Sequence, residues 1–168
     1  MSIVEEKAKS ILINLESSIT NLKSVEQLVD IIPEDVRFVL LGESTHGTHE
    51  FYKIRSDMTK LLIKKRNFKT ILVEGDWPCF YKINKYITNE KSSDNTAIEA
   101  MDGIKKYPLW MWRNNIISEL IEWLQDFNLK FNKNTDSVRM LGLDCYSLIQ
   151  SKKWLIAFLK LVDKDYAK

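Results

Sequence analysis

The chain has 168 residues, the length of one ordinary domain, and 25 basic against 23 acidic residues leave a net charge of only +2. Hydrophobic residues at 45% and charged residues at 29% exclude a disordered or coiled-coil protein. No segment concentrates basic side chains and no apolar run approaches the ~18 residues of a membrane span, so we expect neither a nucleic-acid nor a membrane partner. The N-terminus lacks the apolar core of a secretory signal, and the two cysteines lack metal-ligand spacing, which predicts a reduced, cytoplasmic protein.

Residues 1–32 are predicted to form a helical lead-in. Apolar residues recur at helical spacing from Val4 to Ile19. Ser24 followed by Gln27 is a capping box, which predicts a second, short helix that stops before Pro33.

Residues 34–168 are predicted to form an α/β core. Three short apolar runs, 36–41, 70–73 and 138–143, predict strands, and the lack of apolar/polar alternation is typical of a parallel sheet buried on both faces. Helices are predicted over 48–66, 78–87 and 112–131, and after the capping pair Ser147 and Gln150. This order indicates a three-layer α/β/α fold with a mainly parallel sheet. Three strands are fewer than the usual five or six, so we expect the sheet to be incomplete in this chain.

Ionisable residues follow each predicted strand. Ligands of open parallel sheets bind beyond the carboxyl ends of the strands. The sequence therefore predicts that five side chains share one cleft: Glu43, His46, Glu74, Asp76 and Asp144. A single acid after a strand is equally well explained as a helix N-cap, but three such strand ends, one with Glu-x-x-His, favour a site.

His46 is the candidate general base, because histidine titrates near neutral pH and this one lies in a glycine-bounded loop. Ser44 is a weak nucleophile candidate, because the loop lacks the second glycine of a nucleophile elbow. Metal binding would require a third ligand such as Glu43 or Glu74, and this alternative stays open.

Two arginines fall within the apolar stripes of predicted helices, Arg55 on 48–66 and Arg113 on 112–131. An unpaired guanidinium in a core is too costly, so each is predicted to meet a carboxylate or to line the site. The alternative for both is a purely architectural ion pair. Trp77, Trp110 and Trp112 are candidates for the apolar wall of a substrate pocket, with core packing as the alternative for each.

Four motifs, in this order, resemble the erythromycin esterase family. They are Leu-Gly-Glu-Ser-Thr-His-Gly-Thr-His-Glu-Phe at 41–51 with Arg55 after it, Val-Glu-Gly-Asp-Trp-Pro at 73–78, Trp-Met-Trp-Arg-Asn at 110–114 and Gly-Leu-Asp-Cys-Tyr-Ser-Leu at 142–148. The resemblance spans about residues 38–160. It implies an α/β fold with a deep cleft and hydrolysis of the macrolactone ester of erythromycin.

The resemblance also implies roles for individual residues. His46 would be the base that activates water, with Glu43, Arg55 and Glu74 as its active-site partners and Arg55 as a donor to the oxyanion. It implies that metal is not essential in at least some members, and we expect no metal or cofactor here. Five further residues are expected to contact the substrate: Trp77, Trp110, Trp112, Arg113 and Asp144.

Members of the family are much longer, and the resemblance implies further active-site histidines in their later half. This sequence has no histidine after His49. We therefore expect residues 1–168 to be the N-terminal part of such a hydrolase domain, with little or no activity alone and with a missing C-terminal half as its partner. The expected substrate is a small-molecule ester or lactone, and macrolide resistance is the expected role. The alternative is a module that binds a metal or ligand in the same cleft without turnover.

Overall fold

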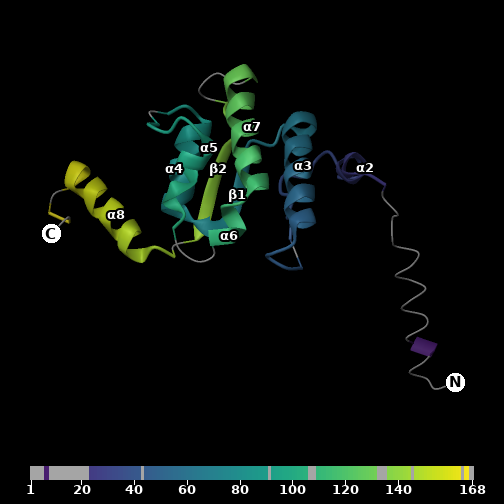
Figure 1. Ribbon diagram of the computed structural model, residues 1–168, viewed down its shortest axis with the longest axis horizontal. Coiled ribbons are helices and arrows are strands. Elements are labelled where there is room, and N and C mark those ends of the chain that lie inside the picture. The colour runs from purple at the N-terminus through teal and green to yellow at the C-terminus, as the bar shows by residue number, and fades with distance from the viewer. Residues whose placement is uncertain are drawn as a thin grey trace. The chain divides into compact units, whose positions relative to one another are not determined.

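The computed structural model describes residues 6–7, 23–42, 44–90, 92–105, 109–131, 136–144, 146–163 and 165–166 (Figure 1). The chain divides into two compact units, Met1–Val36 and Arg37–Lys168. All the described candidate site residues belong to the second unit.

The first unit contains helix α2, Val25–Asp30. Its N-cap is Ser24, whose hydroxyl accepts the backbone N–H of Gln27 at 3.3 Å, so the predicted N-cap is confirmed. The Gln27 side chain accepts the N–H of Lys23 at 2.8 Å, one residue before the position that a capping box requires. The helix predicted from Val4 to Ile19 lies outside the described residues, apart from residues 6–7.

The second unit contains a parallel pair of strands, β1 (Thr70–Asp76) and β2 (Arg139–Asp144). An irregularity in the register brings Asp76 opposite Asp144 at the carboxyl ends of the strands. Gly142 permits this approach, because a Cβ at that position would lie 2.3 Å from the carbonyl oxygen of Gly75. The mixture of helices with a small parallel sheet is an incomplete α/β fold, as predicted.

The other elements of the second unit are helical. They are α3 (His49–Arg66), α4 (Trp77–Ile87), α5 (Ala97–Ala100), the 3₁₀ turn η1 (Met101–Gly103), α6 (Leu109–Trp112), α7 (Asn115–Phe131) and α8 (Leu148–Val162). Helix α4 packs along β2, and α7 lies beside α3 and α4 (Figure 1). The core between them is apolar and includes Phe80, Ile83, Ile87, Ile121, Leu124, Val138 and Met140.

Local sequence explains two of these helix ends. Helix α3 ends at Asn67, whose φ of 56° is left-handed, a conformation that asparagine tolerates well. Helix α4 begins directly after β1, with Pro78 in its first turn, where the missing N–H costs nothing.

Two buried asparagines satisfy backbone groups of the segment that carries β2. The side chain of Asn128 accepts the N–H of Val138 and donates to its carbonyl, at 2.8 and 2.9 Å. The side-chain oxygen of Asn84 accepts the N–H of Met140 at 3.2 Å. These side chains replace the hydrogen bonds that another strand would supply.

The strand predicted over 36–41 is not formed in the described part of the chain. This segment has no strand assignment, and Phe38 and Leu40 are 81% and 92% exposed. An apolar run becomes a strand only when a neighbouring backbone pairs with it, and β1 pairs here with β2.

The helix predicted over 112–131 is two helices, α6 and α7. Asn114 restarts the chain as an N-cap, because its side-chain oxygen accepts the N–H of Ile117 at 3.0 Å. Arg113 therefore lies between the helices, outside the apolar stripe where it was predicted.

The buried face of α3 also differs from the prediction. It contains Tyr52, Ser56, Met58, Leu62 and Ile63, whereas the apolar Ile54 on the same helix is 46% exposed. Because this face includes a tyrosine and a serine, a pattern of apolar residues alone does not reveal it.

Candidate active site

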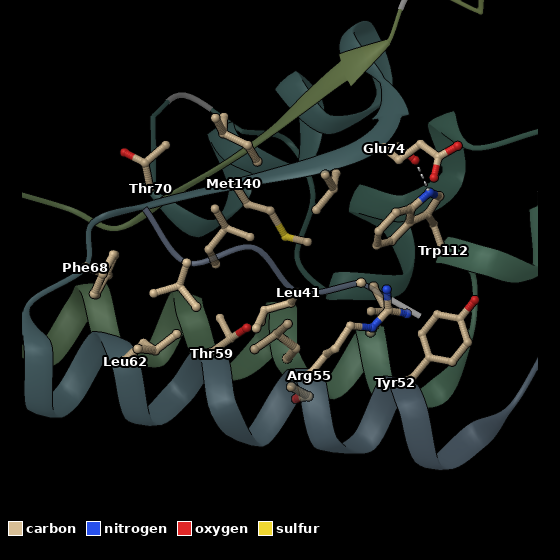
Figure 2. Close-up of a pocket in the computed structure, with 18 of the residues that line it drawn as sticks. Leu41, Tyr52, Arg55, Thr59, Leu62, Phe68, Thr70, Glu74, Trp112 and Met140 are labelled. Atoms are coloured by element: carbon tan, nitrogen blue, oxygen red, sulfur yellow. Dashed lines mark hydrogen bonds between the residues drawn. The ribbon is translucent and has the colours of Figure 1, made fainter. Parts of the chain in front are cut away.

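A cavity of about 380 Å³ lies between α3, β1 and the segment that contains Val39 and Leu41 (Figure 2). Its lining brings together three residues predicted to be catalytic, His46, Arg55 and Glu74, with Trp112 from the predicted substrate-binding group. They come from the loop before α3, from α3 itself, from β1 and from α6. Glu43 lies outside the described residues.

The cavity has a polar end and an apolar end. Arg55, Tyr52, Trp112 and Glu74 lie toward one end, and Leu62 and Phe68 toward the other (Figure 2). Such a cavity suits a ligand with a reactive polar group attached to an apolar body.

His46 is held next to two aromatic side chains. The hydroxyl of Tyr52 donates a hydrogen bond to the carbonyl oxygen of His46. The imidazole lies 6.1 Å from the nearer ring centroid of Trp110, tilted by 46°. A second hollow next to the cavity is also lined by His46, together with His49, Trp110 and Asn114. The exposed imidazole of His46 therefore borders both hollows.

Arg55 belongs to the lining of the cavity, which is one of the two positions that the sequence predicted for it. Its guanidinium carbon is 4.8 Å from the centre of the Tyr52 ring, a cation–π distance. Its Nε donates to the carbonyl of Phe51 at 3.4 Å.

Glu74 is placed by the backbone of β1. The indole Nε1 of Trp112 donates to the carbonyl oxygen of Glu74 at 2.8 Å, and Trp112 is only 8% exposed (Figure 2). The Glu74 carboxylate is exposed and lies 3.5 Å from the hydroxyl of Tyr146. Desolvation, together with the carboxylates of Asp144 and Glu74, raises the pKa of Tyr146 above its ordinary value of 10.0, so its hydroxyl stays protonated to higher pH.

Asp76 is engaged in holding the start of α8. Its carboxylate accepts the backbone N–H of Ser147 at 3.0 Å and also the Ser147 hydroxyl. Ser147 is the N-cap residue of α8, but its side chain forms no cap hydrogen bond, so the predicted capping pair with Gln150 is wrong. Ser147 instead joins the helix to β1.

Cys79 is a further donor to Asp76, at 3.4 Å. Burial and the Asp76 carboxylate raise the pKa of the Cys79 thiol to about 12. Cys79 is therefore a neutral thiol at neutral pH and a poor nucleophile.

Asp144 and Trp77 do not line the cavity. Asp144 ends β2, and its Oδ2 is buried without a hydrogen-bond partner among the described residues. Trp77 stacks on Tyr81 at 5.2 Å and meets Trp154 of α8 edge-on at 5.6 Å.

Arg113, too, lies outside the cavity lining. Its Nη2 is 3.3 Å from the Asp102 carboxylate in a partly exposed ion pair. This is the architectural pairing that the sequence left open as the alternative.

Tyr52 and Tyr146 also contact the predicted site residues, although no sequence pattern marked them as candidates. Tyr52 lies three positions before Arg55, a spacing that places both on one face of a helix. Tyr146 lies inside the motif at 142–148, and its place in that motif could have identified it as a candidate.

A metal site was the open alternative for this cleft, and one of its expected ligands, Glu43, lies outside the residues that the structure describes. Among these residues, no three His, Cys, Asp or Glu side chains are grouped so that they could hold a metal ion. Among the described helices, none is long and apolar enough to cross a membrane.

The geometry defines an α/β protein with a histidine loop, an arginine of α3 and a glutamate of β1 around one cavity. Residues 63–168, more than half of the chain, match the family model described as erythromycin esterase. The chain therefore belongs to the erythromycin esterase family. The match contains Glu74 and Trp112, whereas His46 and Arg55 precede it.

The fold is also similar to the crystal structure of a protein from Bacillus cereus. The TM-score is 0.56 and the sequence identity 21%, with 74% of this chain and 28% of that chain covered. The chain thus spans less than a third of this relative's length.

Proposed function

We propose that this chain carries the water-activating part of a hydrolase that cleaves an ester or lactone. The observation that carries this proposal is the presence of His46, Arg55 and Glu74, from three separate segments, in the lining of one cavity. When water attacks a carbonyl carbon, a base removes its proton, a cation stabilises the oxyanion and a carboxylate can orient the base.

In the proposed reaction, His46 removes a proton from water, and the water oxygen bonds to the carbonyl carbon of the substrate. Glu74, and Glu43 by resemblance to the family, orient the water and the imidazole. Arg55 donates to the oxygen that becomes negative in the tetrahedral intermediate. The carbon–oxygen bond to the alcohol then breaks, and the leaving oxygen takes the proton from His46. The products are a carboxylic acid and an alcohol.

The substrate is proposed to be largely apolar. Leu62, Phe68 and other apolar side chains lie at one end of the cavity, and Trp110 lies next to His46 in the lining of the second hollow. A macrolactone, as the family's name indicates, or another bulky ester would meet these surfaces, and macrolide resistance would follow from cleavage of such an antibiotic.

We also propose that further polypeptide completes the site. The chain covers only 28% of the similar Bacillus cereus protein. Helix α8 has no buried residue, and its exposed apolar side chains offer a surface for that polypeptide: Leu148, Ile149, Leu155, Phe158, Leu161 and Val162.

The proposal is tested with the full chain, with and without the remaining part of the family domain added. Erythromycin and a chromogenic acyl ester are the substrates, and mass spectrometry detects the gain of one water. We expect His46→Ala to lower kcat by about 10²–10⁴-fold. His49→Ala, which changes the other exposed histidine of the chain, is the matched control and retains activity.

Unchanged turnover in His46→Ala would contradict the mechanism. If no preparation turns over either substrate, and low concentrations of a divalent metal raise the Tm, the chain is a binding module instead.

A further inference from the structure

Two buried aromatic side chains hold the backbone of the candidate site. Tyr52 is 5% exposed and donates to the carbonyl of His46, and Trp112 is 8% exposed and donates to the carbonyl of Glu74. A buried tyrosine or tryptophan must satisfy its polar hydrogen. Here both acceptors are carbonyls of residues in the lining of the cavity.

The two contacts differ in what they hold. Glu74 belongs to β1, whose backbone is already paired with β2. His46 lies in a loop, where its described neighbours form neither helix nor strand. A side-chain hydrogen bond therefore has the larger effect on the position of His46.

Tyr52 contacts Arg55 as well as His46. Its ring lies under the Arg55 guanidinium at 4.8 Å, on the same cavity wall (Figure 2). One rigid side chain from α3 thus contacts both the loop that carries the proposed base and the cation proposed to stabilise the oxyanion.

We propose that Tyr52 is a positioning residue that sets the His46 loop relative to Arg55. Its hydroxyl fixes the His46 carbonyl, and its ring supports the guanidinium. The kinetic consequence rests on the proposed function, whereas the structural consequence does not.

The first test is proton NMR of the full chain. The sequence contains two histidines, so two imidazole Cε1–H signals are expected, and His46→Gln and His49→Gln assign them. Tyr52→Phe keeps the ring over which Arg55 lies and removes only the hydroxyl. We expect it to shift the His46 signal, to leave the His49 signal in place, and to speed amide exchange at residues 44–48 by about tenfold.

Tyr86→Phe is the matched control. Tyr86 is 3% exposed in α4, and the substitution removes the same atom from a buried tyrosine outside the cavity lining. It is expected to leave the His46 signal and the exchange of the loop unchanged. Equal spectra for Tyr52→Phe and the wild-type chain, or equal effects of the two variants, would overturn the inference.

The second test is kinetic. In a preparation that turns over ester, Tyr52→Phe is expected to lower kcat by about 10–100-fold with KM within about twofold, because misplacing the base affects the chemical step. If His46→Ala abolishes hydrolysis but Tyr52→Phe retains full kcat, the inference fails and the proposed function stands. If Tyr52→Phe moves the His46 signal while His46→Ala remains active, the proposed function fails and the positioning stands.

If Tyr52→Phe does not fold, the inference is tested on the wild-type chain instead. An NOE from the ring of Tyr52 to the backbone of residues 46 and 47 is expected. Its absence overturns the inference.

Discussion

Three donors converge on the carboxylate of Asp76: the backbone N–H and the hydroxyl of Ser147, and the thiol of Cys79. At the scale of single residues, these contacts separate two acids that look alike in the sequence. Asp76 joins β1 to the start of α8, whereas Glu74 is exposed and belongs to the cavity lining. The partner atoms therefore distinguish the structural acid from the candidate for chemistry.

The thiol of Cys79 is expected to react slowly. Its pKa of about 12, against 9.0 for an ordinary thiol, lowers the thiolate fraction at pH 8 by about three orders of magnitude. In a Cys145→Ser background, we expect iodoacetamide to alkylate Cys79 at least about 100-fold more slowly in the folded chain than in urea. Equal rates in the two conditions would contradict the raised pKa.

The same shift predicts how stability changes at high pH. Between pH 9 and 12 the folded state retains a proton that the unfolded state releases, so the free energy of unfolding falls as the pH rises. Well below pH 9 the Cys79 thiol is protonated in both states and contributes no pH dependence to stability. Cys79→Ser is expected to flatten the decline in urea titrations between pH 9 and 11, and an unaltered decline would assign it to other groups.

At the scale of elements, polar side chains and a glycine decide how β2 fits. Asn84 and Asn128 supply hydrogen bonds to the backbone on the side of β2 facing the helices, and Gly142 allows close contact with β1. Neither feature belongs to an apolar pattern. Both are specific to the tertiary arrangement of α4, α7 and the two strands.

Asn128→Ala is expected to destabilise the fold strongly. The side chain bonds the carbonyls of Ile87 and Val138 and the N–H of Val138, and its loss leaves these buried groups without partners. At about 1–3 kcal/mol for an unsatisfied group, we expect a loss of at least about 3 kcal/mol in urea unfolding. The exposed Asn95→Ala is the control and changes stability by less than about 0.5 kcal/mol.

Gly142→Ala is expected to disturb the strand ends. The new Cβ would lie 2.3 Å from the carbonyl oxygen of Gly75, so the strands must move apart. We expect a loss of at least about 2 kcal/mol on thermal unfolding. Gly47→Ala, where a Cβ meets no atom within 4 Å, is the control. Equal Tm values for the two variants would show that the strand ends tolerate a side chain.

At the scale of the whole molecule, the second unit has a buried core but also apolar surface that the described residues leave uncovered. Leu124 is fully buried, whereas Leu155 and Phe158 of α8 are 57% and 58% exposed. The chain spans 28% of its solved relative. The exposed apolar face of α8 is therefore the surface that we propose further polypeptide covers.

The exposed face is expected to contribute little to the stability of the chain itself. The double variant Leu155→Gln and Phe158→Gln should change the free energy of unfolding by less than about 1 kcal/mol and reduce self-association in analytical ultracentrifugation. Leu124→Ala, in the core, should cost about 2–5 kcal/mol. A comparable loss in the double variant would show that α8 is packed in solution.

Local spacing along the chain was enough to predict several elements of the fold. The helices over 49–66, 77–87 and 148–162, the Ser24 cap and the strands near 70 and 139 follow from patterns within a few residues. The four motifs also indicated the erythromycin esterase family, which the match over residues 63–168 confirms.

Which side chains meet depends on how distant segments pack, and this could not be predicted from spacing. His46, Arg55 and Glu74 line one cavity, but Trp77 and Arg113 face Trp154 and Asp102 instead. The segment 36–41 is apolar enough for a strand but has no ladder partner in the described residues, since strand pairing is a contact between distant segments. The importance of Tyr52 likewise depends on a hydroxyl that reaches across a turn to a carbonyl. Spacing predicts which residues share a helix face, whereas contacts across loops depend on the packed chain.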